Sequence, residues 1–155
     1  MMGVFIMFDE NSINMSGFSI NQLYIGKTGR ISKTITESDI YTFAGVTGDF
    51  NPLHVNAEYA KTTRFGERIA HGMLTASFFS TVLGMLLPGA GAIYLSQNCK
   101  FLLPVKIGDT VTAECVITEI IKEKRIITLA TTAYNQRGEK VVSGEAKMMV
   151  TKPEE

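Results

Sequence analysis

The chain has 155 residues, of which 45% are hydrophobic and 19% are charged, so it can bury a core and has the size of one domain. Fifteen basic residues balance fifteen acidic residues. No run of one sign occurs, which argues against the cationic surface that nucleic acids require. No apolar stretch reaches the ~20 residues that span a bilayer, so no membrane partner is expected.

The two cysteines, Cys99 and Cys115, form no CxxC motif and are too few for a disulfide scaffold. Both lie in alternating, strand-like segments, which predicts that they are small buried hydrophobes. A reducing, cytoplasmic setting follows as the expected localisation.

Residues 1–17 are predicted to be a loosely attached N-terminal extension, and residues 18–152 a single domain. The extension opens with the apolar run MMGVFIMF. It lacks the basic segment and the small-residue cleavage site of a signal peptide, and Asp9 and Glu10 follow at once. We assign it no function.

Strand and helix signals follow one another in the first third of the domain. The stretch 26–36 carries two isoleucines four residues apart, on one face of an extended chain, and predicts a first strand. A helix is expected next, with Thr36 as its N-cap, Asp39 three positions later, and Gly48 at its end. The stretch 48–56, GDFNPLHVN, is predicted to be irregular because it contains an Asn-Pro turn signal.

A short helical piece is expected to begin after Asn56 as its N-cap. The segment 72–87, GMLTASFFSTVLGMLL, has no charge and is apolar or small almost all round. Such a composition predicts a helix that is buried on every side, with Pro88 and Gly89 ending it.

Four β-branched segments with alternating polarity follow, at 92–105, 110–124, 125–136 and 141–151. Their short links predict an antiparallel meander. The fold class expected is therefore α+β, a hot-dog fold in which an antiparallel β-sheet of about five strands wraps around one long buried central helix. One chain covers the helix and the sheet edges incompletely, which predicts a homodimer or a dimer-based homo-oligomer.

The side chains that could carry chemistry gather near the Pro-broken loop. Asp49 lies five residues before His54, and His71 is the only other histidine. An irregular loop can bring Asp49 and His54 together, although a structural pair, with the aspartate capping a turn, is the commoner outcome of such spacing. Gly72 opens the apolar helix, where unpaired N–H groups could stabilise a developing oxyanion or serve only as a packed helix start.

Three segments resemble the MaoC-like dehydratase family, and most closely its R-specific enoyl-CoA hydratases. They are TFAGVTGDFNPLHVNAEYA, FGERIAHGMLTASFFS and YLSQNCKFLLPVKIGDTV, and the resemblance covers roughly residues 18–151. It implies that Asp49 and His54 bind and activate the catalytic water and that the Gly72 amide faces the thioester oxygen. It also implies that Ser80 lines the substrate site and that Asn51 holds the loop in shape.

The resulting hypothesis is reversible, (R)-specific hydration of trans-2-enoyl-CoA to (R)-3-hydroxyacyl-CoA by a lyase without metal or other cofactor. An acyl-thioester is the expected partner, with CoA or acyl carrier protein as its carrier. An acyl-carrier-protein dehydratase is therefore an open alternative. Apolar side chains that could hold the acyl chain, or simply form the core, are Phe78, Phe79, Leu83, Met85, Leu95 and Phe101. Cations near the loop that could meet CoA phosphates, or simply be solvated, are Lys61, Arg64 and Arg68.

Three further alternatives share these residues. A metal enzyme could use Asp49, His54 and His71 as ligands, although no fixed ligand spacing supports one. A thioesterase could use the same acyl-thioester site. A non-enzymatic module could bind acyl-thioesters without turnover.

Overall fold

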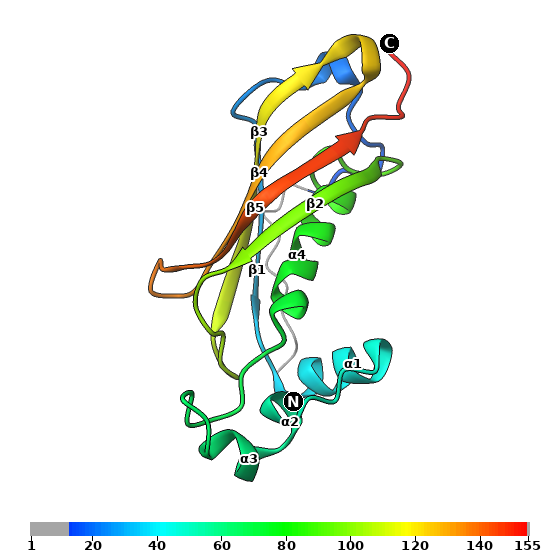
Figure 1. The fold of residues 1–155 in the computed structure, drawn as a ribbon. Helices are drawn as coiled ribbons and strands as arrows, with labels where there is room; N and C mark the ends of the chain where they lie inside the picture. The colour runs from blue at the N-terminus through cyan, green and yellow to red at the C-terminus, as the bar shows by residue number, and fades with distance from the viewer. Residues whose placement is uncertain (1–12, 155) are drawn as a thin grey trace.

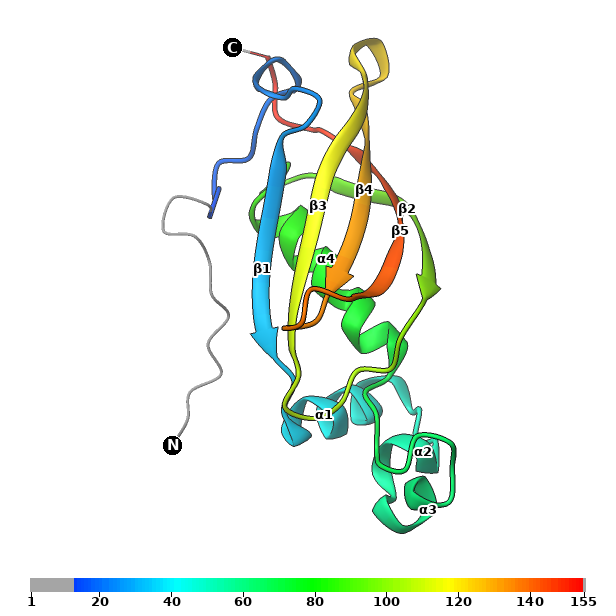
Figure 2. The same cartoon turned by 90° about the vertical axis from the view of Figure 1, so that its left-hand side faces the viewer.

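The computed structural model describes residues 13–154, which fold into one antiparallel sheet with a long helix across it (Figures 1 and 2). The strands, in sheet order, are β1 (Thr28–Thr34), β3 (Thr110–Ile121), β4 (Ile126–Tyr134), β5 (Lys140–Met149) and β2 (Ile93–Phe101). The long helix is α4 (Gly72–Met85). Two single-turn 3₁₀ helices, Ile20–Gln22 and Lys122–Lys124, complete this part of the structure.

Helix α4 crosses one face of the sheet, as Figure 2 shows. Its buried side chains include Phe79, Val82 and Leu83, all of which are fully enclosed. They belong to one core cluster with inward-facing strand residues such as Ile117 and Leu129. The burial of these apolar side chains supplies most of the driving force for folding. The expected α+β hot-dog fold with five antiparallel strands is confirmed.

The predicted meander is correct for β3, β4 and β5 and wrong for β2. Strand β2 pairs with β5, whereas β1 pairs with β3 at the opposite edge. The link 102–109 therefore leaves β2 at one edge and crosses to β3. Residues 69–70 pair with residues 105–106 of this link, through an isolated bridge and an Ala70 N–H bond to the Val105 oxygen of 2.7 Å. Alternation of polarity predicts strands but not which strands pair.

Helix α1 (Glu37–Thr47) begins and ends where the sequence predicts. The Thr36 hydroxyl accepts the Asp39 N–H, and the Asp39 carboxylate accepts the Thr36 N–H, so the capping box is complete. Gly48 ends the helix with a φ of +79°, a conformation that favours glycine. The chain therefore enters the Asp49 loop from a fixed point.

The loop after α1 is more regular than predicted. Pro52–Val55 forms a short helix, α2, with Asn51 as its N-cap, so the expectation of irregular structure is wrong there. Proline is well tolerated at the first helical position because no N–H is needed. Helix α3 (Ala57–Lys61) follows, with Asn56 as its N-cap as predicted.

Helix α4 is not buried on every side, which corrects a second expectation. Its exposed residues line one side of the helix: Gly72, Met73, Ser77, Ser80, Gly84 and Met85. A single sheet covers only one face of a helix, so within one chain the other face stays open. Helix α4 therefore has more apolar surface than this sheet alone can bury.

The start of the described chain contacts the end of α4, and the two cysteines are enclosed to different degrees. Residues 1–12 of the predicted extension lie outside the described residues, while Asn14 donates its N–H to the Met85 oxygen at the end of α4 (2.8 Å). The boundaries of the extension and the domain stay predictions. Cys115 is buried and Cys99 half-buried, both as free thiols. Across residues 13–154, no helix has both the length and the apolar character needed to cross a membrane.

Candidate active site

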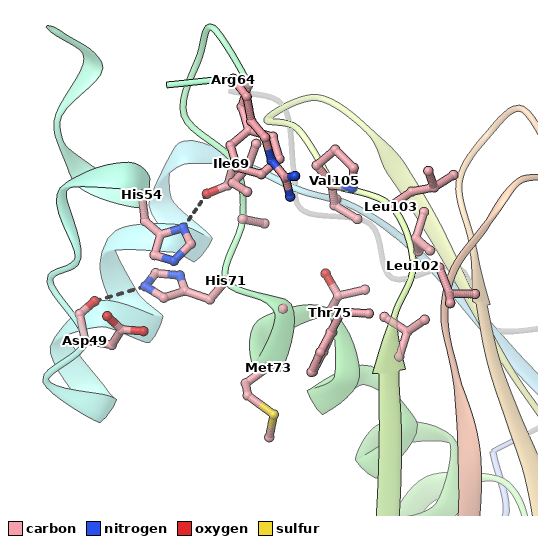
Figure 3. A pocket seen from close by; sticks show the side chains of 17 residues that line it. Asp49, His54, Arg64, Ile69, His71, Met73, Thr75, Leu102, Leu103 and Val105 are labelled. Carbon is pink, nitrogen blue, oxygen red and sulfur yellow. Dashed lines mark hydrogen bonds between the residues drawn. The ribbon is translucent and has the colours of Figure 1, made fainter. Parts of the chain in front are cut away.

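A cavity of about 380 Å³ opens at the amino end of α4. Figure 3 shows Asp49, His54 and His71 on one side of it and the apolar residues Leu102, Leu103 and Val105 of the β2–β3 link on the other. The first turn of α4 lies between the two sides. A polar cluster and an apolar wall thus face the same space.

His54 is held by the loop that it faces. It is buried on α2, and its Nδ1 donates to the Ile69 carbonyl oxygen at 2.7 Å, since a carbonyl can only accept. The other nitrogen, Nε2, is left as a hydrogen-bond acceptor. Burial is the main cause that lowers the pKa of His54 below its usual 6.5, and the neighbouring His71 acts in the same direction. The bond to Ile69 and the charge of Asp49 oppose that shift in pKa. His54 is therefore neutral and able to accept a proton at pH 7.

His71 links the cavity to the loop, a role that was not predicted for it. Its Nε2 donates to the backbone oxygen of Asp49 at 3.0 Å. Its ring stacks on His54 with centroids 3.9 Å apart and packs against Phe43 at 4.9 Å. In the sequence, only its position indicated that His71 could belong to the site, because it is the second of two histidines and directly precedes Gly72.

Asp49 is exposed, and the structure brings it to both histidines. One ligand atom from each of Asp49, His54 and His71 lies within 4.8 Å of the other two. The Asp49 Oδ1 accepts the Asn51 N–H at 3.1 Å, and the Asn51 Oδ1 accepts the Leu53 N–H at 3.1 Å. Asn51 thus shapes the loop, and its substrate contact stays a prediction.

The three side chains would also suit a transition metal, because two imidazole nitrogens and a carboxylate form a common donor set. The metal-enzyme alternative therefore has its candidate ligands together. The same arrangement can hold one water between a base and a carboxylate.

Gly72 begins α4 and lines the cavity. The N–H groups of Leu74 and Thr75 both donate to the His71 oxygen, whereas the Gly72 amide precedes the first intrahelical bond. A Cβ on Gly72 would lie 2.7 Å from the Phe101 ring, so a side chain at this position would displace that ring. The positive end of the helix therefore opens on the cavity.

Ser80 does not reach this cavity within one chain. It lies on the exposed side of α4, two turns after Gly72, and its substrate contact stays a prediction. Of the proposed acyl-binding side chains, Phe101 lines the cavity, whereas Phe78, Phe79 and Leu83 belong to the core. Met85 and Leu95 are exposed and do not line the cavity.

Thr75 is a cavity residue that the sequence analysis missed. Its side chain is buried in the second turn of α4, and Figure 3 shows it beside the apolar wall. Thr75 and Thr81 are the two threonines of the apolar segment 72–87, and their spacing does not show which of them reaches a cavity. The apolar wall itself was missed because the sequence did not show where the β2–β3 link crosses.

The fold and the site together define a hot-dog protein with an Asp–His pair at the amino end of its central helix. The family model for the MaoC like domain matches residues 25–138, and the chain belongs to this family. The resemblance seen in the sequence is thereby confirmed.

Named relatives and solved structures agree with this assignment. An (R)-specific enoyl-CoA hydratase of Rhodospirillum rubrum is 54% identical over 125 residues, which cover 81% of this chain and 86% of that protein. The solved (R)-hydratase of Aeromonas caviae has a TM-score of 0.81 and 45% identity, covering 83% of this chain and 98% of that one. An unliganded R-hydratase of Pseudomonas aeruginosa has a TM-score of 0.84 and 41% identity, covering 88% of each chain.

The lowered pKa of His54 predicts an acid-sensitive fold. Because His54 takes up a proton more readily unfolded than folded, the free energy of unfolding decreases as the pH falls below about 6.5. The decrease between about pH 7.5 and about pH 5.5 should be smaller in His54→Gln than in the wild type, because the substituted side chain does not titrate. Urea unfolding at each pH measures it. Equal decreases in the two proteins would contradict the assignment.

Proposed function

We propose that this protein hydrates trans-2-enoyl-CoA reversibly to (R)-3-hydroxyacyl-CoA. The observation that carries the proposal is the convergence of Asp49, His54 and the amino end of α4 on one cavity with an apolar wall. Hydration needs a base for water, a proton for the α-carbon and a donor for the carbonyl. These three needs match the three groups.

Water is held between the Asp49 carboxylate and the His54 Nε2 in this mechanism. His54 accepts a proton as the water oxygen bonds to C3 of the enoyl group, and the π electrons move toward the thioester oxygen. The Asp49–His54 pair then delivers a proton to C2. One water is added across the double bond, and no electron is transferred to or from the substrate. General acid–base catalysis of this kind is worth roughly 10²–10⁴ in rate.

The amino end of α4 stabilises the charge that develops. The thioester oxygen becomes enolate-like when C3 is attacked, and in this mechanism the N–H of Gly72, which lines the cavity, donates to it. An amide donor of this type is worth roughly 3–4 kcal/mol in the transition state. The chemistry needs no cofactor beyond the carrier of the acyl group. The relatives named as (R)-specific hydratases support the R configuration of the product.

Hydration is tested by the loss of enoyl absorbance with trans-2-butenoyl-CoA. Wild-type enzyme should turn over, and Asp49→Asn and His54→Ala should each lower kcat by about 10²–10⁴ because each removes a proton-transfer group. An (S)-specific hydroxyacyl-CoA dehydrogenase should not oxidise the product. Exhaustive chelation should leave the rate unchanged.

Glu58→Gln serves as the control, because Glu58 is an exposed carboxylate on α3 paired with Lys61, and it should retain full activity. Turnover only with enoyl-acyl carrier protein would favour the dehydratase alternative. Thiol release from saturated acyl-CoA would indicate a thioesterase. Binding without any turnover would indicate a binding module, and stoichiometric metal with chelator sensitivity would indicate a metal enzyme.

Arg64 is the cation we propose for the phosphates of CoA. Of the three cations near the loop, Lys61 pairs with Glu58 and Arg68 pairs with Glu37. Arg64 lines the cavity and stacks on the Phe65 ring, with 4.8 Å from its guanidinium carbon to the ring centroid. Within residues 13–154 it forms no ion pair. Its charge is therefore available to a ligand at the cavity mouth.

Replacing Arg64 should weaken substrate binding without slowing chemistry. In Arg64→Ala, KM for butenoyl-CoA should rise by about tenfold with kcat nearly unchanged, since a charge-assisted hydrogen bond contributes roughly 1.5–3 kcal/mol. Lys61→Ala is the matched control and should leave KM unchanged. A fall in kcat with constant KM would place Arg64 in the chemistry instead.

We also propose that two copies associate through β2 and the exposed side of α4. Strand β2 pairs only with β5, so its other edge is unpaired within residues 13–154. Its side chains Tyr94 and Leu95 are exposed, as are Met73 and Met85 of α4. An open strand edge beside apolar side chains favours pairing with a second chain.

Light scattering at micromolar concentration should give the mass of two chains or a multiple of it. Leu95→Glu places a charge at this surface and should shift the mass toward one chain, whereas Ile25→Glu changes an exposed residue before β1 and should not. A wild-type monomer would contradict the proposal, as would a Leu95→Glu dimer of unchanged stability on dilution.

A further inference from the structure

Thr75 carries a buried hydroxyl that has no protein partner. Its exposed fraction is 1%, and its Oγ1 forms no hydrogen bond within the part of the chain that the structure describes. An unpaired buried hydroxyl destabilises the folded state. Because Thr75 also lines the cavity, a bound ligand can supply the missing partner.

The usual partner of a helical hydroxyl is already engaged. A threonine in a helix commonly donates to a carbonyl three or four residues earlier, as Ser77 does to Leu74 in this helix. For Thr75 the oxygen four residues earlier belongs to His71. That oxygen already accepts the N–H groups of Leu74 and Thr75, and the Thr75 hydroxyl does not join them.

The position of Thr75 directs its hydroxyl toward the amino end of α4. Thr75 follows Gly72 by three residues and therefore shares its face of the helix. Side chains on a helix lean toward its N-terminus and cover the preceding turn. The hydroxyl thus lies over the turn at which the Gly72 amide opens on the cavity.

A second buried polar atom without a partner lies at the same cavity. Three buried side-chain polar atoms lack a partner among the described residues, on Asn14, His71 and Thr75. The last two both line this cavity. Unpaired buried polar atoms that share one cavity indicate a site that a polar ligand completes.

We propose that the Thr75 hydroxyl donates a hydrogen bond to the thioester carbonyl oxygen of the substrate, beside the Gly72 N–H. This inference rests on the proposed function and makes Thr75 a catalytic residue for it. The carbonyl oxygen gains negative charge when water adds to C3, so a donor aimed at it binds the transition state more tightly than the ground state. The hydroxyl keeps its own proton throughout, and no further group is needed.

Two substitutions test the donor. Thr75→Val keeps the shape and removes the hydroxyl, and it should lower kcat/KM for butenoyl-CoA by about 10², the lower end of the loss for one oxyanion donor. Thr75→Ser keeps the hydroxyl and should retain activity within about threefold. Thermal unfolding checks the fold, because removing an unpaired buried hydroxyl should not lower the Tm. Wild-type kcat/KM in a folded Thr75→Val enzyme would overturn the proposal.

A spectroscopic measurement separates this donor from the hydration reaction. Butyryl-CoA labelled with ¹³C at its carbonyl cannot be hydrated, and its C=O stretch falls in frequency when the oxygen accepts a hydrogen bond. The downshift on binding should be large with wild type and Thr75→Ser and smaller with Thr75→Val. This result would support the donor even if no enoyl-CoA were hydrated, in which case only the proposed function fails. Equal downshifts in all three proteins would overturn the donor.

Discussion

The site depends on the hydrogen bond from the His71 Nε2 to the backbone oxygen of Asp49. These residues are 22 positions apart in the chain, and one caps the central helix while the other begins the loop after α1. The bond therefore ties the loop after α1 to the start of the central helix. Because the His71 ring also stacks on His54, one side chain sets the relative positions of the carboxylate, the base and the helix end.

Several groups of this site are held in environments that reduce the stability of the folded state and leave them available to a substrate. His54 is buried beside a second imidazole, which lowers its pKa, and the hydroxyl of Thr75 and the Nδ1 of His71 are buried without partners. The two unpaired atoms lower stability in the absence of a ligand, and the lowered pKa of His54 lowers it as the pH falls below about 6.5. Functional sites commonly contain such features, because a group satisfied by the protein is less available to a substrate. The extensive core under α4 offsets their cost.

Local signals in the sequence predicted local structure well. Thr36 with Asp39, Gly48 and Asn56 gave the ends of α1 and α3 because caps act over three or four residues. Helix α2 was missed because the Asn-Pro pair is typical of turns as well as of a first helical turn. Residue type and position marked Asp49, His54 and Gly72 as candidates, and the resemblance to the MaoC-like family supplied their expected roles. The pairing of β2, the apolar wall of residues 102–105 and the position of Thr75 depend on contacts between distant segments, which a pattern along the chain does not encode.

The amino-acid composition of α4 indicates that a second copy of the chain covers its exposed side. Its residues are apolar or small all round, yet one side is exposed in the single chain, including Met73 and Met85. A helix exposed on one side in its final state would normally carry charges there. The uncharged exposed side, continuous with the open edge of β2, is consistent with burial against a second copy. Ser80 lies on this side. If Ser80 lines the substrate site and this side forms the dimer interface, the substrate site of one chain must extend along the surface that the other chain covers.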